Sequence, residues 1–371
     1  MLVLKTRKDI LLKPLQAAVG VVERKHTLPI LSNVLIEADR NRVAFVATDL
    51  ELQITTWMED ESAEIAAQTA FTVSARKLLD ICRSLPDSEA LNLDLDGEQL
   101  KLKAGKSRFS LQTLPARDFP KLQIADGEGI SFSLPQGRLR HLLGRVQYAM
   151  AVQDIRYYLN GMLMSLQGDK LIVASTDGHR LAVDASKLEQ PPEGGMDVIL
   201  PRKTVQELIK LLSDNDEPVH IQMASGQVVI RHPGFELRSK VVDGKFPDWQ
   251  RVVPTGYGMS FHIQRQRLGQ ALNRAAILTN EKYRGVRLAL TEGSLRIACS
   301  NNEQEEAQEE LDIEYAKEPL DIGFNVQYLQ DVLNNIDADT VTCSFGDPTS
   351  SMLITLPGED HFRYVVMPMR I

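Results

Sequence analysis

Apolar and polar residues alternate from Leu91 to Lys103, and the alternation is interrupted once, at Asp96-Gly97. A period of two is typical of a strand with one buried face, and Asp-Gly is a common hairpin turn. Similar alternation occurs around Gly226, over residues 219–231, and again over residues 341–355. The pattern therefore predicts three antiparallel β-hairpins, spaced widely along the chain.

Apolar residues at helical spacing mark a different set of segments. Leu139, Leu142, Leu143 and Val146 lie three or four positions apart, as they would on one face of a helix. We expect a helix over 135–152, with Pro135 in its first turn, and similar helices over 7–20 and 264–277. A second set of helices is expected over 75–84, 202–213 and 325–335. Helices combined with antiparallel strands indicate an α+β fold.

The same order of elements recurs three times. An apolar run that ends in a hydroxyl residue and an Asx residue occurs at Thr48-Asp49, Thr176-Asp177 and Ser300-Asn301. The two steps between these markers are 128 and 124 positions. A fixed period is the signature of a repeated structural unit. We therefore expect three copies of one module, over residues 1–125, 129–254 and 258–371.

The composition is that of an ordinary globular protein, with 371 residues, 43% hydrophobic and 25% charged. No apolar run approaches the length of a membrane span, and the N-terminal residues turn polar too early for a secretory signal. Cys82, Cys299 and Cys343 are far apart and do not have the spacing of a zinc site. We expect three reduced, buried thiols in a cytoplasmic protein, with no metal and no cofactor.

Charge is distributed unevenly along the chain. The net charge is −8, which argues against nucleic acid as a partner, because DNA-binding proteins usually show a basic footprint. The six predicted helices, however, hold fifteen Lys or Arg residues and four acidic residues. Either helix surfaces here are simply rich in Lys and Arg, or the helices form a basic face. Since exposed helices usually mix both signs, we favour a face that contacts a phosphate backbone without reading bases.

Two short segments could carry chemistry. Gly105-Lys106-Ser107 matches the end of a phosphate-binding loop, but the glycine required five positions earlier is absent. Asp177, His179 and Arg180 could serve acid–base chemistry in a hydrolase or transferase. The repeat argues otherwise for Thr176-Asp177, whose counterparts in the other modules predict a capped turn at a strand end. No matched nucleophile or metal partner accompanies His179, so a non-enzymatic function is favoured and an enzyme is the alternative.

Several segments resemble one family closely, the bacterial sliding clamp, which is the beta subunit of the replicative DNA polymerase. The resemblance covers the chain and is carried by residues 156–162, 176–182, 243–247, 280–287, 303–307 and 364–370. It implies a head-to-tail homodimeric ring of similar domains, with basic helices around a hole that duplex DNA threads. It also implies a groove between modules two and three, where the polymerase, the clamp loader, other polymerases and repair proteins dock an extended peptide with a Gln followed by Leu and Phe.

The resemblance assigns roles to individual positions. The groove residues it implies are Leu159, Thr176, Gly178, His179, Arg180, Leu181, Pro247, Arg251, Val252, Asn325, Tyr328, Ser351, Val365, Val366, Met367, Pro368, Met369 and Arg370. The DNA contacts it implies are Lys25, Arg76, Gln153, Tyr157, Tyr158, Arg202 and Lys203. The dimer contacts it implies are Lys77, Lys106, Arg108, Phe109, Leu111, Ile277, Leu278, Glu303, Glu305, Glu306 and Glu309. Trp249 stands where the family commonly has Tyr, beside the implied groove.

Overall fold

The computed structural model describes residues 1–23, 28–39, 42–58, 64–65, 68–87, 89–123 and 129–370. The chain divides into two compact units. The first unit comprises Met1–Gly137 with Gln206–Val241, and the second comprises Arg138–Val205 with Val242–Ile371. The predicted boundary at residues 124–128 lies outside the described residues.

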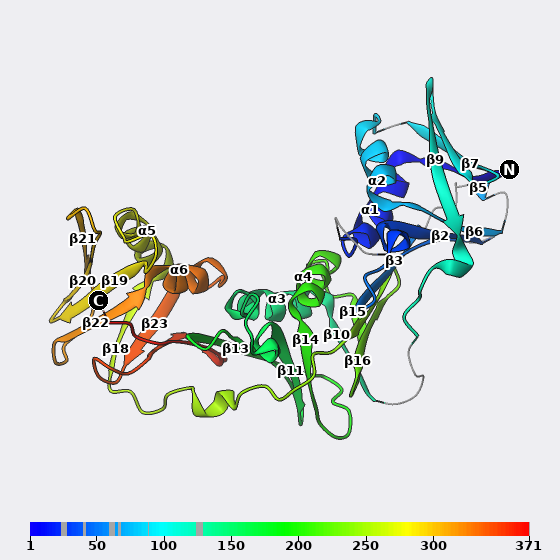
Figure 1. Ribbon diagram of the computed structural model, residues 1–371. Coiled ribbons are helices and arrows are strands. Elements are labelled where there is room, and N and C mark those ends of the chain that lie inside the picture. The colour runs from blue at the N-terminus through cyan, green and yellow to red at the C-terminus, as the bar shows by residue number, and fades with distance from the viewer. Residues whose placement is uncertain are drawn as a thin grey trace. The chain divides into compact units, whose positions relative to one another are not determined.

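The first unit is built on one long antiparallel sheet, drawn in blue, cyan and green in Figure 1. Its strand order is β10-β15-β16-β17-β4-β3-β2-β6-β9-β8-β7-β1-β5. The strands are β1 (Leu2–Arg7), β2 (Asn33–Asp39), β3 (Arg42–Thr48), β4 (Leu52–Met58), β5 (Glu64–Ile65), β6 (Thr69–Ser74), β7 (Ala90–Asp96), β8 (Gln99–Ala104), β9 (Ser107–Pro115), β10 (Ile130–Pro135), β15 (Pro218–Ala224), β16 (Gln227–His232) and β17 (Phe235–Lys240). Helices α1 (Lys8–Val19) and α2 (Ala75–Ser84) lie side by side on one face, where α1 packs on β3 and β4 and α2 packs on β2 and β6.

The second unit holds two antiparallel sheets, ordered β14-β11-β12-β13-β25-β24-β23-β18 and β21-β20-β19-β22. The strands are β11 (Gly161–Gln167), β12 (Lys170–Thr176), β13 (Arg180–Lys187), β14 (Met196–Pro201), β18 (Met259–Gln264), β19 (Gly285–Thr291), β20 (Ser294–Ser300), β21 (Glu306–Asp312), β22 (Leu320–Asn325), β23 (Thr340–Phe345), β24 (Met352–Leu356) and β25 (Glu359–Val366). Helices α5 (Arg265–Ala276) and α6 (Val326–Asn334) pack against each other and against these strands. The remaining α-helices of the described chain are α3 (Gln136–Val146) and α4 (Arg202–Leu211).

The expected hairpins and the α+β class are confirmed. Strand β7 pairs with β8, β15 with β16, and β23 with β24, each in an antiparallel register. In the first hairpin the turn residues are Gly97 and Glu98 rather than Asp96-Gly97, because Asp96 still pairs with Gln99. Gly97 has a φ of +58°, a conformation that glycine adopts without the steric cost other residues meet. The alternation thus located the strands, and the glycine located the turn.

Modules two and three each end by adding a strand to the sheet of the preceding module. The last strand of module two, β17, pairs with β4 of module one. The last strand of module three, β25, pairs with β13 of module two in the same way. In the described chain, β21 is the outer strand of its sheet, and the first half of β9 pairs with β8 on one side only. The first half of β9 in module one and β21 in module three are therefore two of the open strand edges of the described chain.

The helices begin close to where the sequence predicted, with two differences. Pro135 is the last residue of β10 and not part of the first helical turn, since it pairs with Pro218 in the sheet. The predicted helix over 135–152 ends at Val146 and continues as a short 3-10 turn, Gln147–Ala149. Helix α2 covers the predicted range of 75–84.

Three of the fifteen cationic side chains in the predicted helices serve the interior instead of an open face. The Lys8 ammonium is buried and donates to the carbonyl of Leu85 at 2.5 Å and to Asp87 at 2.8 Å. Arg265 donates to two backbone carbonyls near the end of α6. Arg145 is buried among carboxylates. Periodicity cannot reveal these partners, because they come from distant parts of the chain.

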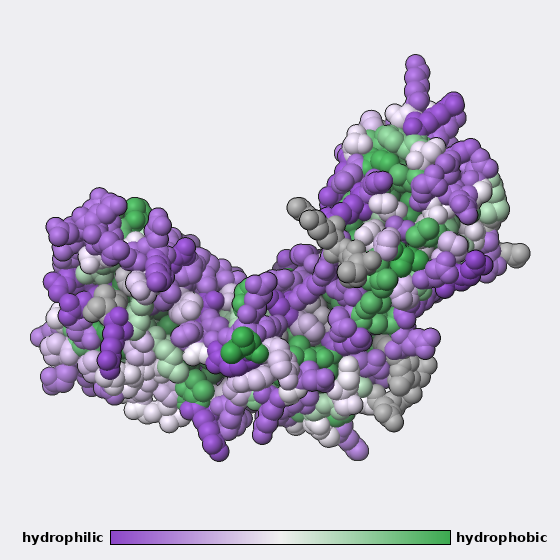
Figure 2. All heavy atoms as spheres, in the orientation of Figure 1, coloured by the Kyte–Doolittle hydropathy of each residue, from purple (hydrophilic) through white to green (hydrophobic). Residues whose placement is uncertain are grey.

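The cores are apolar, and the surface is mostly hydrophilic. Figure 2 shows hydrophobic residues reaching the visible surface of each unit only in limited patches. Cys82, Cys299 and Cys343 are all buried and unpaired, as expected, and burial raises the pKa of each thiol. None of the helices in the described part of the chain has the length and apolar character that a membrane span requires.

Candidate functional site

The capped turn predicted at the repeated hydroxyl-Asx dipeptide is present in all three modules. Asp177 accepts hydrogen bonds from the backbone N–H of His179 at 2.9 Å and of Arg180 at 3.1 Å. Asp49 and Asn301 hold the equivalent turns through the same side-chain oxygen. This shared role makes the Asx residue part of the architecture and leaves the three residues after it free to differ among modules.

Gly178 differs from its counterparts for a reason outside the turn. Its φ of +88° is matched by Leu50 at +79° in module one, so this backbone geometry does not require glycine here. A Cβ atom on Gly178 would instead lie 3.1 Å from a guanidinium nitrogen of Arg156. Glycine at this position therefore leaves room for the Arg156 side chain beside the turn.

Arg180 links modules two and three. Its guanidinium donates to Asp177 at 3.1 Å, to Asp331 on α6 at 2.5 Å and to the carbonyl of Tyr148 at 2.7 Å. The same group lies over the Tyr328 ring, 4.4 Å from its centroid. The pKa of Arg180 is raised despite its burial, because the neighbouring acidic groups favour the charged form. Arg180 thus fixes the wall of the site and uses most of its donors within the protein.

A pocket of about 210 Å³ lies beside this turn, where β13 pairs with β25. Leu181 and Val365 face each other across the two strands and belong to its apolar floor. Phe246 packs into the same cluster from the segment after β17, and Met367 stands at the rim with 43% of its surface exposed. The implied groove residues that line the pocket are Leu159, Thr176, Gly178, His179, Arg180, Leu181, Pro247, Val252, Val365 and Met367.

The other implied groove residues lie around the pocket and do not line it. Val366 is fully buried on the opposite face of β25 from Val365, because neighbouring residues of a strand point to opposite sides. Tyr328 lies next to the pocket wall, where its ring stacks on the ring of His179 at a centroid distance of 6.5 Å. Asn325 caps α6, and Arg251 forms an ion pair with Asp248. The carbonyl of Ser351 accepts a hydrogen bond from Tyr257. Pro368, Met369 and Arg370 lie in the tail after β25.

The tail is held in place by two backbone hydrogen bonds. The N–H of Met367 donates to the carbonyl of His179 at 2.8 Å, and that of Met369 donates to the carbonyl of Gly323 at 2.9 Å. These bonds join the end of the chain to the turn of module two and to a strand of module three. The C-terminal segment is therefore part of the pocket's construction.

Three lining residues had no groove role in the sequence prediction. Arg156, Tyr158 and Trp249 all line the pocket. Tyr158 had been assigned to DNA, but it packs against the apolar floor together with Trp249. Arg156 is held by two hydrogen bonds to Asp154, which lower the pKa of that carboxyl to about 2. The Phe246-Pro247 step shortly before Trp249 was the available signal, since it directs the following segment onto the pocket.

The arrangement does not form a catalytic centre. Asp177 is occupied by the turn and by Arg180, and His179 is exposed and stacked on an aromatic ring. Among the described residues no group of three or more His, Cys, Asp or Glu side chains is placed to hold a metal ion. What remains is a small apolar pocket with polar groups at its rim, which is typical of a site that binds a short linear segment of a partner.

Comparison with known proteins covers the chain from end to end. Models of the DNA polymerase III beta subunit match in three consecutive parts, with the N-terminal domain at 2–123, the central domain at 133–248 and the C-terminal domain at 250–370. The chain belongs to the DNA polymerase III beta subunit family. It is 45% identical over 365 residues to the beta sliding clamp of Pseudomonas aeruginosa, covering 98% of this chain and 99% of the relative. It is 42% identical to that of Escherichia coli K12, covering 98% of each.

Solved structures of this beta subunit family agree with the fold. The crystal structure of the beta subunit from Pseudomonas aeruginosa matches with a TM-score of 0.93 at 44% identity, over the whole of both chains. A sliding clamp from Bartonella birtlesii bound to griselimycin matches with a TM-score of 0.92 at 35% identity, also over the whole of both chains. The three-module α+β fold and the family membership predicted from the sequence are thereby confirmed.

The dimer contacts implied by the beta subunit family lie in two groups, one in module one that includes residues of β9 and one in module three that includes residues of β21. Phe109 and Leu111 are in β9, and Arg108 is exposed beside them. Lys77 is on α2 and Lys106 is in the turn before β9, both exposed. In module three, Ile277 follows α5 with 76% of its surface exposed, next to the half-buried Leu278. Of the acidic set, Glu303 and Glu306 are exposed, whereas Glu305 binds Asn301 and Glu309 binds Arg274 within the chain.

The implied DNA contacts are distributed more widely. Arg76 donates to the carbonyl of Val22 at 2.7 Å, and Arg202 donates to that of Met150 at 3.0 Å, so both also brace loops within their modules. Gln153 and Tyr157 lie on an exposed loop in which Gln153 has a φ of +55°. Lys203 is half-buried at the start of α4, and Lys25 lies outside the described residues.

Proposed function

We propose that this chain is a DNA sliding clamp, which confers processivity on the replicative DNA polymerase by encircling duplex DNA. The observation that carries the proposal is the match of all three modules to the DNA polymerase III beta subunit over nearly the full length. A clamp of this kind is not an enzyme and needs no cofactor. We place it in the cytoplasm, where the DNA is, with modules bounded at 1–125, 129–254 and 258–371.

Ring closure follows from the way modules join within the chain. Strand β17 completes the sheet of module one, and β25 completes that of module two. If a second copy continues the series, its module one adds β9 to the open edge β21 of module three. Two such junctions, related by symmetry, close a head-to-tail dimer and pair the open edges of β9 and β21.

The internal junctions predict the register of this contact. Phe109 in β9 corresponds to Leu237 in β17, because each is the third residue of its strand, and Leu237 pairs with Ile54 of β4. Ile54 of β4 corresponds to Ala307 of β21. In each module, this position comes directly after the residue that pairs with the repeated hydroxyl residue, which is Thr48 in module one and Ser300 in module three. We therefore expect Phe109 to lie opposite Ala307 of a second copy, and Arg108 opposite Gln308.

The exposed groups at the two edges complement each other. Phe109 and Leu111 would meet Ile277 and Leu278, which form the apolar centre where binding energy concentrates. Lys77, Lys106 and Arg108 would meet the acidic set of Glu303, Glu305, Glu306 and Glu309 at the rim. Since Glu305 and Glu309 already have partners within the chain, we expect the other two acids to supply most of the electrostatic attraction.

DNA would contact the ring through the basic helices and the loops beside them. The residues we assign to this surface are Lys25, Arg76, Gln153, Tyr157, Tyr158, Arg202 and Lys203. Contact to phosphates is independent of sequence and weakens with salt. A protein with a net charge of −8 then holds DNA by enclosure, and its local positive charges permit sliding.

Partners would dock in the pocket between β13 and β25. The apolar floor suits the Leu and Phe side chains of a linear motif, and the polar rim suits its Gln. We assign to this groove the residues that the family resemblance implies, except Val366, which lies on the opposite face of β25, together with Arg156 and Trp249, which line it. Because few side chains are buried, binding at micromolar strength is expected. The polymerase, the clamp loader and repair proteins would compete for the same groove.

Primer extension tests the proposal directly. On singly primed circular DNA, the cognate polymerase with its clamp loader and this protein should synthesise much longer products per binding event than the polymerase alone. A variant with Ile277→Ala and Leu278→Ala, which is expected not to form the ring, serves as the control. Product lengths that are the same with and without the protein would contradict the proposal.

A further inference from the structure

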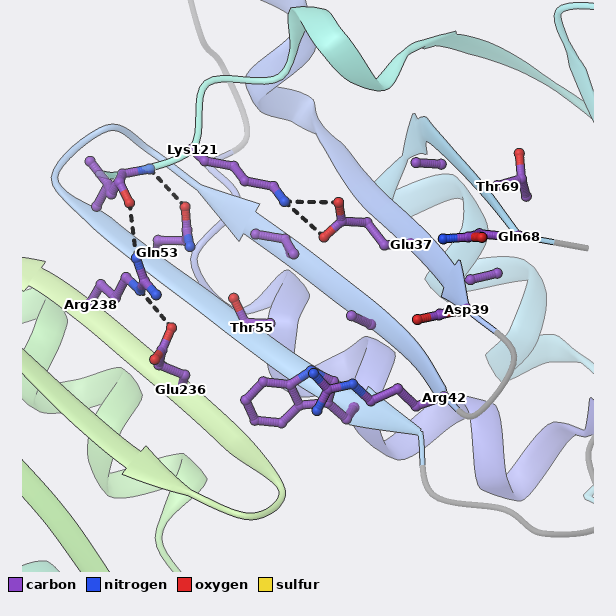
Figure 3. Close-up of a pocket in the computed structure, with 16 residues that line it drawn as sticks. Glu37, Asp39, Arg42, Gln53, Thr55, Gln68, Thr69, Lys121, Glu236 and Arg238 are labelled. Atoms are coloured by element: carbon purple, nitrogen blue, oxygen red, sulfur yellow. Dashed lines mark hydrogen bonds and ion pairs between the residues drawn. The ribbon is translucent and has the colours of Figure 1, made fainter. Parts of the chain in front are cut away.

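A second cleft, of about 570 Å³, lies where β4 of module one pairs with β17 of module two (Figure 3). Its lining comes from strands β2, β3, β4, β6 and β17 and from the segment after β9. In Figure 3 the side chains of Glu37, Gln53, Thr55, Lys121 and Arg238 gather around it. All of these residues belong to the first unit of the chain.

This cleft and the peptide groove occupy equivalent places in the repeat. Each lies where the last strand of one module pairs with the preceding module. Each is followed or bordered by a Phe-Pro step, Phe119-Pro120 in the cleft and Phe246-Pro247 in the groove. Phe119 packs with Leu35 and Val46, as Phe246 packs with the residues at the same places of β11 and β12. The two sites therefore share their backbone framework and their apolar base.

The side chains above the shared apolar base differ in polarity between the cleft and the groove. In the cleft, Gln53 pairs with Thr48 on one side and with Arg238 on the other. In the groove, Leu181 pairs in the same way with Thr176 and with Val365. The substitutions from groove to cleft are Leu181 to Gln53, Val183 to Thr55 and Val365 to Arg238. Three apolar groups of the groove are thus replaced by an amide, a hydroxyl and a guanidinium.

Polar groups around the cleft are joined in two sets, shown by the dashed lines in Figure 3. The Gln53 side chain accepts from the N–H of Leu122 at 2.9 Å, and Arg238 donates to the carbonyl of Leu122 at 3.3 Å. Arg238 also binds Glu236 at 2.5 Å, and Lys121 binds Glu37 at 2.8 Å. An apolar segment placed here would remove water from these groups and give them no new hydrogen bonds, which is unfavourable.

We propose that Gln53, Thr55 and Arg238 are specificity-determining residues, which prevent the junction of modules one and two from binding the apolar linear motif. Each chain then has one peptide site, at the junction of modules two and three, although its fold provides two frameworks. This inference rests on the proposed function of the groove. Its consequence is that all partners of one protomer compete for a single site, so one partner must leave the site before another can bind there.

A gain-of-function variant tests the inference. The variant carries Gln53→Leu, Thr55→Val and Arg238→Val, which copy the groove residues into the cleft. Glu236 keeps a partner, because it also binds Arg231 at 2.9 Å. A variant with Gln53→Asn, Thr55→Ser and Arg238→Lys is the matched control. The probe is a synthetic peptide in which a Gln is followed by Leu and Phe residues, titrated by calorimetry.

The expected stoichiometry is one peptide per chain for the natural protein and the control, and two for the gain-of-function variant, with affinities within about tenfold of each other. One peptide per folded variant chain would overturn the inference and leave the groove assignment intact. Two peptides per natural chain would also overturn the inference alone. If the natural chain bound none, the groove assignment itself would fail, and the inference with it.

A second measurement keeps the inference testable if the variant does not fold. The same peptide, carrying a photoreactive group, is cross-linked to the natural protein at saturation, and the labelled residues are mapped by mass spectrometry. Labels are expected next to the pocket of Leu181 and Val365 and not next to Gln53 or Arg238. Equal labelling of both junctions would overturn the inference.

Discussion

Replacing Arg145 by Met should destabilise the second unit strongly, because it removes the buried guanidinium that pairs with Asp184 and Glu359. The Arg145 side chain is 5% exposed and lies 3.3 Å from Asp184, which is fully buried, and 2.8 Å from Glu359. Its guanidinium also lies over the Phe362 ring at 4.7 Å. Removing one partner of a buried ion pair typically costs about 3–5 kcal/mol. Since Met retains the apolar stem, we expect a loss of about 3 kcal/mol in the free energy of unfolding.

The pH dependence of this loss has a definite sign. Burial already raises the pKa of Asp184, although Arg145 opposes the effect, so the variant should raise that pKa further. A carboxyl whose pKa is raised in the folded state stabilises the fold most at a pH below its pKa in the unfolded state. This contribution is lost as the pH rises through its pKa in the folded state. The deficit of Arg145→Met should therefore be largest near pH 8 and smaller near pH 5.

Urea unfolding followed by Trp249 fluorescence, in a Trp57→Phe background, reports on the unit that contains the cluster. The control is Arg140→Met, an exposed position on the same helix, for which a change within about 0.5 kcal/mol is expected. Adding Asp184→Asn to Arg145→Met should recover at least half of the loss, because the uncompensated charge is gone. A loss below about 1 kcal/mol in the single variant, or no recovery in the double variant, would refute the reasoning.

Three further outcomes are expected. Ending the chain after Val366 removes the pinned tail of the pocket and should abolish peptide binding in fluorescence anisotropy, while native mass spectrometry still shows dimers. Combining Ile277→Ala with Leu278→Ala should give monomers at low micromolar concentration in analytical ultracentrifugation, and an unchanged dimer would contradict the interface assignment. Burial raises the pKa of Cys82 to about 11 and that of Cys343 to about 12, and reactive thiolate forms only as pH approaches these values. These two thiols should therefore resist a thiol-specific reagent at pH 8 until urea unfolds the protein, and rapid labelling of the folded protein would be contrary evidence.

The repeat was the part of the fold most open to prediction. Hairpins such as 91–103 can be predicted from the alternation of apolar and polar residues and from a glycine at the turn, and both signals are local. Pairings between modules, such as β4 with β17, join residues far apart in the chain and leave no comparable local mark. They become predictable only when the repeat is recognised and one junction is known, since the register then transfers from one module to the next.

Many of the implied groove residues line one pocket, but the contacts of individual side chains could not be predicted from the sequence. Arg180 was expected to contact a partner peptide, whereas its donors are used to join modules two and three. Val366 was placed in the groove, but the pleat of β25 turns it to the opposite face. Trp249 lies in a short 3-10 turn, Trp249–Arg251, and such a turn leaves no periodic pattern in the sequence from which the direction of the side chain could be inferred. Family resemblance identifies positions, and only packing shows what each side chain contacts.

The central claim is that two copies close around DNA through β9 and β21, and a cross-link at that contact tests it most directly. Residues paired across antiparallel strands lie about 5 Å apart, within reach of a disulfide, so Arg108→Cys and Gln308→Cys should join the subunits of the ring on oxidation. The three natural cysteines are buried and should not interfere. After loading onto a nicked circular DNA and oxidation, the protein should stay with the circle in denaturing detergent and leave it when the DNA is cut to linear form. Loss from the intact circle despite complete cross-linking, or retention on the linear DNA, would contradict the account.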